Sequence, residues 1–155
     1  MEILLRNAQR KFKIDRKKLV GHIKMALTEL RQPDCEISIM LVNDAKIRRL
    51  NKEYRNRDLA TDVLAFPQDA DAKNDNGGPL LGDVVVSVET SRRQAKKHRL
   101  FAEEELVLLI IHGTLHLLGY DHERSGKDKR EMQNKTRKIF SRIFPGRSPS
   151  GDSDF

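Results

Sequence analysis

Four short segments of the chain have the polar and apolar alternation, or the β-branched composition, that is typical of strands. They are residues 2–6, 36–42, 62–66 and 81–89. Pro67 stops the third segment, since proline cannot donate to a sheet ladder. The polar stretch 68–79 between the last two segments has the composition of an exposed, mobile loop.

Five further segments have the periodicity or the end signals of helices. They are residues 19–30, 44–54, 90–100, 103–119 and 127–143. The fourth contains six successive apolar residues, Leu106 to Ile111, and is predicted to be largely buried. Because strands and helices do not strictly alternate, the pattern predicts an α+β fold in which about five helices cover a small four-stranded mixed sheet.

A chain of 155 residues can bury one core without disulfides. We assign residues 1–144 to a single domain and residues 145–155 to a disordered tail. The one cysteine, Cys35, lies in an apolar segment and is predicted to be a buried hydrophobe, which indicates a reducing compartment. No apolar stretch approaches the roughly 18 residues of a membrane span. We therefore expect a soluble, cytoplasmic protein without a membrane partner.

Basic residues outnumber acidic ones and are clustered along the chain. Thirty Lys and Arg against 23 Asp and Glu give a formal net charge of +7 and a pI near 9.7. The clusters are residues 10–18, 46–49, 92–99 and 127–130. Such clustering is typical of proteins that contact phosphate backbones, although solvated helix faces have the same composition. Aromatic residues make up only 5%, which favours backbone contact over base stacking.

Three histidines have the spacing of metal ligands. His112 and His116 are four residues apart on a predicted helix, so their side chains leave one face with Cβ atoms about 6 Å apart. Gly119 allows the chain to reverse after the helix, so that His122 can supply a third nitrogen. The segment HGTLHLLGYDH thus predicts one divalent ion, preferably zinc, whose fourth coordination position is open for a hydrolytic reaction.

This spacing is similar to the metzincin pattern of zinc proteases in its histidines and its turn glycine. It differs at position 113, where glycine replaces the glutamate that serves those proteases as general base. We hypothesise that Gly113 lets a bulky anionic group approach the metal. Two other interpretations stay open: the histidines align by chance, or Asp121 completes a purely structural site as fourth ligand. Asp121 can also orient a ligand imidazole or act as a base.

Three blocks of sequence resemble the YbeY family of bacterial ribosomal RNA maturation factors, regarded as single-strand-specific, metal-dependent endoribonucleases. The blocks are HGTLHLLGYDH from 112 to 122, NKEYRNRDLATDVLAFP from 51 to 67, and LGDVVVS from 81 to 87. With fitting order and spacing, they cover nearly the whole chain except its tail. Ala65 is a small departure, since the family commonly carries serine there.

The resemblance implies an α+β fold with a three-histidine zinc site, one zinc per chain, between the helices and a small sheet. It also implies a role in maturing the 3′ end of small-subunit rRNA and in ribosome quality control, with the small ribosomal subunit and its assembly proteins as partners. An arginine equivalent to Arg55 is held to be essential in the family. On its own chemistry, Arg55 in a polar turn can clamp a phosphate, although a solvated surface arginine is the simpler interpretation.

We therefore predict a zinc-dependent endoribonuclease that cleaves single-stranded RNA, with Arg55, His112, His116 and His122 as catalytic residues. The three histidines are the predicted metal ligands. One alternative is a zinc-dependent protease or amidase, which Gly113 and the basic surface disfavour. Another is a non-catalytic ribosome assembly factor that keeps zinc for stability. Nothing in the sequence decides between water and the neighbouring 2′-hydroxyl as the attacking group.

Overall fold

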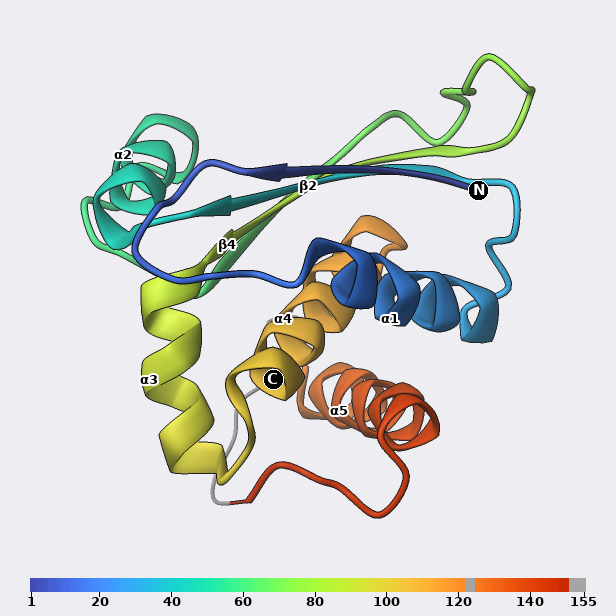
Figure 1. Cartoon of the computed structure of the whole chain (residues 1–155). Helices are drawn as coiled ribbons and strands as arrows, with labels where there is room; N and C mark the ends of the chain where they lie inside the picture. Colours follow the sequence, from blue (N-terminus) through green and yellow to red (C-terminus); the bar gives the residue numbers. More distant parts are fainter. Residues whose placement is uncertain (122–124, 151–155) are drawn as a thin grey trace.

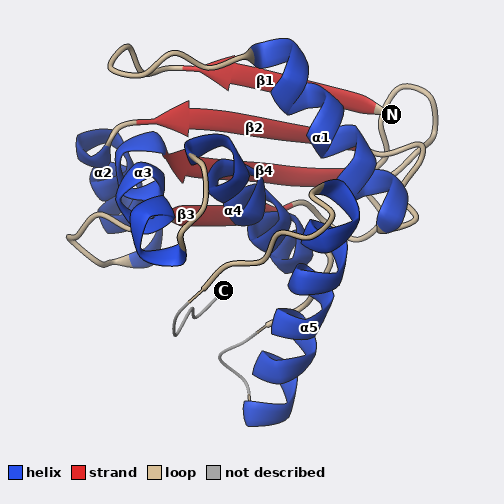
Figure 2. Ribbon diagram, turned by 60° about the horizontal axis from the view of Figure 1, so that its bottom comes forward, coloured by secondary structure: helices blue, strands red, loops and turns tan. Residues whose placement is uncertain are grey.

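The computed structural model describes residues 1–121 and 125–150, and a four-stranded sheet organises them (Figures 1 and 2). The elements in chain order are β1 (Glu2–Asn7), α1 (Arg16–Glu29), β2 (Glu36–Val42), α2 (Asp44–Arg55), β3 (Val63–Pro67), β4 (Leu80–Ser87), α3 (Val88–His98), α4 (Ala102–Leu117) and α5 (Gly126–Ile143). The predicted α+β class, with four strands and five helices, is confirmed.

The strands lie in the order β1-β2-β4-β3, as Figure 2 shows. β1 pairs with β2 and β2 pairs with β4 in parallel, while β3 pairs with β4 in antiparallel fashion at one edge. The sheet is therefore mixed, as predicted. The 68–79 loop has defined contacts: the Asn74 side chain donates to the Asp34 carbonyl (3.0 Å) and accepts from the Gly78 amide (2.9 Å).

Helix α4 forms the centre of the core. It lies with α1 and α5 below the sheet in Figure 1, and every residue from Glu104 to Leu115 is buried. The inward residues of β2 and β4, Ile37, Ile39, Leu41, Val84 and Val86, belong to the same apolar cluster. On the opposite face, α2 packs through Ile47 against a smaller cluster that includes Leu64 and Val85. No helix in the described ranges combines the length and apolar character that crossing a bilayer demands.

The contact between α4 and the sheet is closest at Gly113. A Cβ atom at this position would lie 2.7 Å from Cγ1 of Val84 on β4 and 3.1 Å from Cγ2 of Val63 on β3. Only a residue without a side chain allows the helix to approach so far. The structure thus gives Gly113 a packing role, and this explains a helical glycine better than our hypothesis of access for an anion.

The part of the predicted tail that the structure describes follows a defined path. The Arg147 guanidinium donates from Nε and Nη2 to the Glu104 carboxylate, at 2.9 Å in both cases. The Ser150 amide donates to the His98 carbonyl (2.9 Å). These contacts hold residues 145–150 against the connection between α3 and α4, and residues 151–155 lie outside the described ranges.

A second acid of α4, Glu105, is fully buried and contacts Nδ1 of His98 on α3. Burial, helped by the negative charge of Asp62, raises the pKa of Glu105 to about 8. Burial also lowers the pKa of His98. Both shifts favour the uncharged pair, in which the protonated Glu105 carboxyl donates to the neutral imidazole.

Replacing Gly113 with alanine should destabilise the protein by about 1–3 kcal/mol, because the added methyl group overlaps Val84. Gly21 on α1 is the matched control, since a Cβ atom there meets nothing within 4 Å. Gly21→Ala should leave stability unchanged or raise it by up to about 1 kcal/mol. Urea unfolding followed by circular dichroism measures both, and equal stability of the two variants would disprove the packing role of Gly113.

Glu105→Gln should make the protein less sensitive to high pH. A carboxyl whose pKa is higher in the folded than in the unfolded state binds more protons when folded, so its contribution falls as pH rises from about 4.5 to about 8. The loss approaches about 1.4 kcal/mol per pH unit for one proton. The unfolding free energy should therefore fall less between pH 5.5 and pH 8.5 in the variant than in the parent protein.

Glu104→Gln is the control for that experiment, because the ion pair with Arg147 lowers the pKa of Glu104. Its stabilising contribution is present at neutral pH and is lost as pH falls through the range in which this carboxyl is protonated. The Glu104→Gln protein should thus be less stable than its parent at pH 7. Its unfolding free energy should still decline toward high pH, because Glu105 is unchanged. A Glu105→Gln protein that declines as steeply as its parent would show that Glu105 is ionised in the fold.

Candidate functional site

Two of the predicted site residues, His112 and His116, lie side by side at the end of α4. Their Nε2 atoms are 3.2 Å apart, and their rings meet edge to face at a centroid distance of 4.8 Å. His112 is buried, with 7% of its surface exposed, and His116 is half-buried. The four-residue spacing therefore brings the imidazoles together on one face, as predicted.

The distance between these two nitrogens fits a shared metal ion. Zinc binds imidazole nitrogen at about 2.0–2.1 Å, and tetrahedral geometry then separates two ligand nitrogens by about 3.3 Å. The observed 3.2 Å separation of the Nε2 atoms is close to this value. The separation therefore fits two ligands of one tetrahedral ion, and it equally fits a hydrogen bond between the two rings.

The chain reverses directly after this pair. Gly119 has a φ of +97°, and the Tyr120 amide donates to the Leu115 carbonyl (3.1 Å), the bond that closes a Schellman motif. The turn predicted from Gly119 is therefore present, and Asp121 follows it in a half-buried position. His122, the third predicted ligand, lies outside the described residues. Within residues 1–121 and 125–150, no three His, Cys, Asp or Glu side chains converge as a metal site.

Arg55 is the last residue of α2, one position earlier than the polar turn in which we predicted it. Its Nη2 donates to the Ala65 carbonyl on β3 (2.6 Å), and its guanidinium carbon lies 5.1 Å from the centroid of the Phe66 ring. Tyr54 packs edge-on against the same ring, at 5.3 Å between centroids. Hydrogen bonding and cation–π attraction thus hold Arg55 at the outer edge of β3.

Tyr54 is a surface residue that the sequence pattern misplaced. We counted it with Ile47 and Leu50 on the apolar face of its helix, but 59% of its surface is exposed. Tyr54, Phe66 and Arg55 together form an exposed stack, which we call the Tyr54 stack. The sequence held one signal that could have predicted this stack, namely an aromatic residue next to a candidate phosphate-binding arginine.

The edge strand β3 connects Arg55 with the histidine pair. The Val63 side chain lies against Gly113, which is the neighbour of His112. Two residues along the strand, Ala65 holds Arg55 through its carbonyl and pairs with Val84, the other side chain that meets Gly113. A five-residue strand thus attaches both predicted site elements to the same edge of the sheet.

Comparison with known proteins agrees with these observations. A model of the family described as "Endoribonuclease YbeY" matches residues 4–144. A protein of that name from Aquifex aeolicus is 38% identical over 134 residues, which are 86% of this chain and 87% of the relative. Another from Geobacter sulfurreducens is 35% identical over 147 residues, 94% of this chain and 98% of the relative.

A relative from an Anaeromyxobacter species, also named Endoribonuclease YbeY, is 50% identical over 109 residues, 70% of this chain and 55% of the relative. The solution structure of TM1509 from Thermotoga maritima superimposes with a TM-score of 0.63 at 27% identity, covering 94% of this chain and 99% of that one. Sequence blocks, fold and matched length agree with one another. The chain belongs to the Endoribonuclease YbeY family.

Proposed function

We propose that this protein is a zinc-dependent endoribonuclease that cleaves single-stranded RNA. The observation that carries the proposal is the 3.2 Å separation of the two Nε2 atoms, in a chain whose relatives are named endoribonucleases. Arg55, which is bound to the same edge strand β3, and the formal net charge of +7 favour a polyanionic substrate.

His112, His116 and His122 are the proposed ligands of one zinc ion. Three neutral imidazoles leave the ion its full double charge and one open position. When bound there, zinc supplies Lewis acidity toward a phosphate oxygen and lowers the pKa of a coordinated water. The protein contributes the fixed positions of the rings, since α4 is buried along most of its length.

Arg55 is proposed to bind the phosphate that is cleaved. A guanidinium has five N–H donors, and the bond to Ala65 fixes the group through Nη2. The remaining donors can pair with two phosphate oxygens, in the bidentate geometry that lysine cannot provide. Charge that develops on the phosphate during cleavage is then stabilised by a group that needs no rearrangement.

The Tyr54 stack supports a preference for single strands. An exposed aromatic ring offers a stacking surface to any unpaired base, whereas bases in a duplex are already stacked on one another. Phe66 lies beside the proposed phosphate-binding guanidinium, and Tyr54 packs edge-on against Phe66. A strand whose phosphate is bound by Arg55 can therefore place a neighbouring base on this stack.

The cellular role that we propose is processing of rRNA, namely maturation of the 3′ end of the small-subunit rRNA, and ribosome quality control in the cytoplasm. Family membership and the basic clusters support this role. The proposed partners are rRNA and the small ribosomal subunit with its assembly proteins.

A zinc protease or amidase is less well supported. Such enzymes use a glutamate directly after the first histidine as general base. In this protein that position faces Val63 and Val84 so closely that even a Cβ atom would overlap them. A non-catalytic assembly factor that keeps zinc for stability differs from an endoribonuclease in one measurable respect, the cleavage of RNA.

The purified protein should cleave a single-stranded RNA oligonucleotide, leave the duplex form and casein intact, and lose its activity after chelation and regain it with zinc. His116→Ala should abolish cleavage, because two imidazoles hold the ion too weakly. Gel electrophoresis of labelled RNA reports the result. Persistent cleavage by the His116→Ala protein would reveal a contaminating nuclease, and intact RNA with the zinc-loaded parent protein would favour the assembly factor.

Arg55→Ala should lower kcat by about 10²–10³-fold, the effect of removing one donor to developing charge. Arg55→Lys should restore little of the activity, because lysine keeps the charge but not the planar fork. Arg49→Ala removes one positive charge from an exposed position of the same helix and should stay within about threefold of the parent. Equal losses of kcat in the Arg55 and Arg49 variants would show that Arg55 contributes only its positive charge and no specific phosphate contact.

A further inference from the structure

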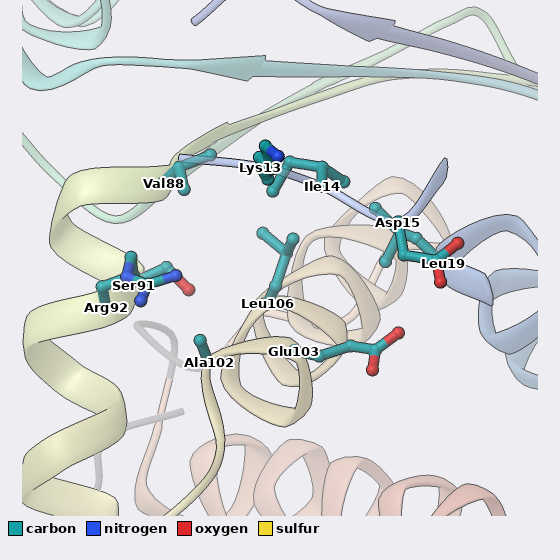
Figure 3. Close-up of a pocket in the computed structure, with 10 residues that line it drawn as sticks. All are labelled: Lys13, Ile14, Asp15, Leu19, Val88, Ser91, Arg92, Ala102, Glu103 and Leu106. Carbon is teal, nitrogen blue, oxygen red and sulfur yellow. The ribbon is translucent and has the colours of Figure 1, made fainter. Parts of the chain in front are cut away.

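A cavity lies at the opposite end of α4 from the histidine pair. Its volume is about 210 Å³, and Figure 3 shows the side chains around it. The lining residues are Lys13, Ile14, Asp15, Leu19, Val88, Ser91, Arg92, Ala102, Glu103 and Leu106. None of them takes part in the proposed cleavage reaction.

The position of the cavity in the fold is one at which α/β proteins bind ligands. Lys13 and Ile14 belong to the segment that follows β1, and Val88 and Ser91 belong to the segment that follows β4. The two strands flank β2 in the parallel part of the sheet. The cavity therefore lies outside the carboxyl ends of two parallel strands, β1 and β4.

Three helices begin at this cavity. Asp15 is the N-cap of α1, Val88 is the first residue of α3, and Ala102 is the first residue of α4. Each helix start carries a partial positive charge from its backbone dipoles. Converging helix starts favour a ligand with a negatively charged group, although Glu89 in the first turn of α3 and Glu103, Glu104 and Glu105 in that of α4 offset part of this charge.

Ser91 provides an independent indication of a ligand. It is 1% exposed, and its Oγ has no hydrogen-bond partner within the part of the chain that the structure describes. Buried hydroxyl groups in proteins are almost always hydrogen-bonded. In Figure 3 Ser91 extends from α3 on the side that lines the cavity. An acceptor on a bound molecule would satisfy this hydroxyl.

The lining includes two cationic and two acidic side chains, and one of the two carboxylates is paired with a lysine outside the lining. Lys13 and Arg92 are exposed lining residues, and the Arg92 guanidinium lies over the Phe12 ring at 4.3 Å. The two lining carboxylates have partners of their own. Oε2 of Glu103 lies 3.0 Å from Lys18 Nζ, and Asp15 accepts from the Lys18 amide (3.1 Å), while Oε1 of Glu103 is buried without a hydrogen-bond partner among the described residues.

The remaining surface suits a small apolar ring. Ile14, Leu19, Val88 and Leu106 supply aliphatic walls. The volume is below the roughly 300–1,000 Å³ of sites for drug-sized ligands, so the enclosed part of the ligand is one ring system. We propose that this cavity binds a nucleoside phosphate, with the base between the aliphatic walls, Ser91 hydrogen-bonded to it, and the phosphate between Lys13 and Arg92.

Isothermal titration of the full chain with AMP and UMP tests the proposal. At least one of them should bind, and adenosine or uridine should bind about tenfold more weakly, since charge-assisted contacts are lost. Arg92→Gln and Ser91→Ala should each weaken binding by about tenfold or more. Lys96→Gln is the matched control, because Lys96 is exposed on the same helix but does not line the cavity.

Further binding measurements test whether the nucleotide binds in this cavity and whether it comes from an RNA end or is a free nucleotide. His116→Ala should bind the nucleotide as the parent does, whether or not the protein cleaves RNA, because this cavity lies away from the histidine pair. Ala102→Leu, which fills the cavity, should abolish binding while circular dichroism stays unchanged. A 5′-phosphorylated oligonucleotide that binds the His116→Ala protein more tightly than its 5′-hydroxyl form would identify an RNA end as the source, and equal binding would identify the free nucleotide.

Three results would overturn the proposal. The first is the absence of binding by AMP, UMP and the 5′-phosphorylated oligonucleotide at millimolar concentration. The second is equal affinity of the parent, Arg92→Gln and Ser91→Ala proteins. The third is loss of nucleotide binding in His116→Ala, which would assign the nucleotide to the metal site.

Discussion

The close approach of α4 to the sheet is the constraint on which the rest of the structure depends. It requires a residue without a side chain at Gly113, because Val84 and Val63 occupy the space of a Cβ atom. With the helix at this distance, the neighbouring His112 is held beside the edge of the sheet. The same contact leaves no room for a glutamate after the first histidine. One steric requirement therefore positions the proposed metal ligands and separates this site from that of the zinc proteases.

The two ends of α4 contribute to two different candidate sites. At its carboxyl end, two imidazoles stand at the spacing of metal ligands, and the edge strand holds Arg55 nearby. At its amino end, helix starts and cationic side chains surround a small cavity. Between them, buried polar contacts such as Glu105 with His98 join α4 to α3. The helix thus forms a rigid support between a proposed reaction site and a proposed ligand site.

The sequence predicted the elements well where local signals and packing agree. The apolar run of α4 and the helical spacing of His112 and His116 follow from periodicity alone, and both are found. Predictions failed where a long-range contact decides. The predicted strand 81–89 ends at Ser87, whose hydroxyl donates to the Asp44 carboxylate on α2 (2.6 Å). Tyr54, which we predicted on the apolar face of its helix, instead packs against Phe66 on β3 and is exposed. Such contacts leave no periodic signal.

The proposed function depends most on three imidazoles that bind one zinc ion with one position open to substrate. X-ray absorption spectroscopy at the zinc edge of the purified protein tests this directly. We expect about one zinc per chain, with three histidine nitrogens at about 2.0–2.1 Å and one further light-atom ligand that exchanges with solvent. A spectrum with fewer than three imidazoles, with a fourth ligand from the protein, or with no stoichiometric metal would contradict it.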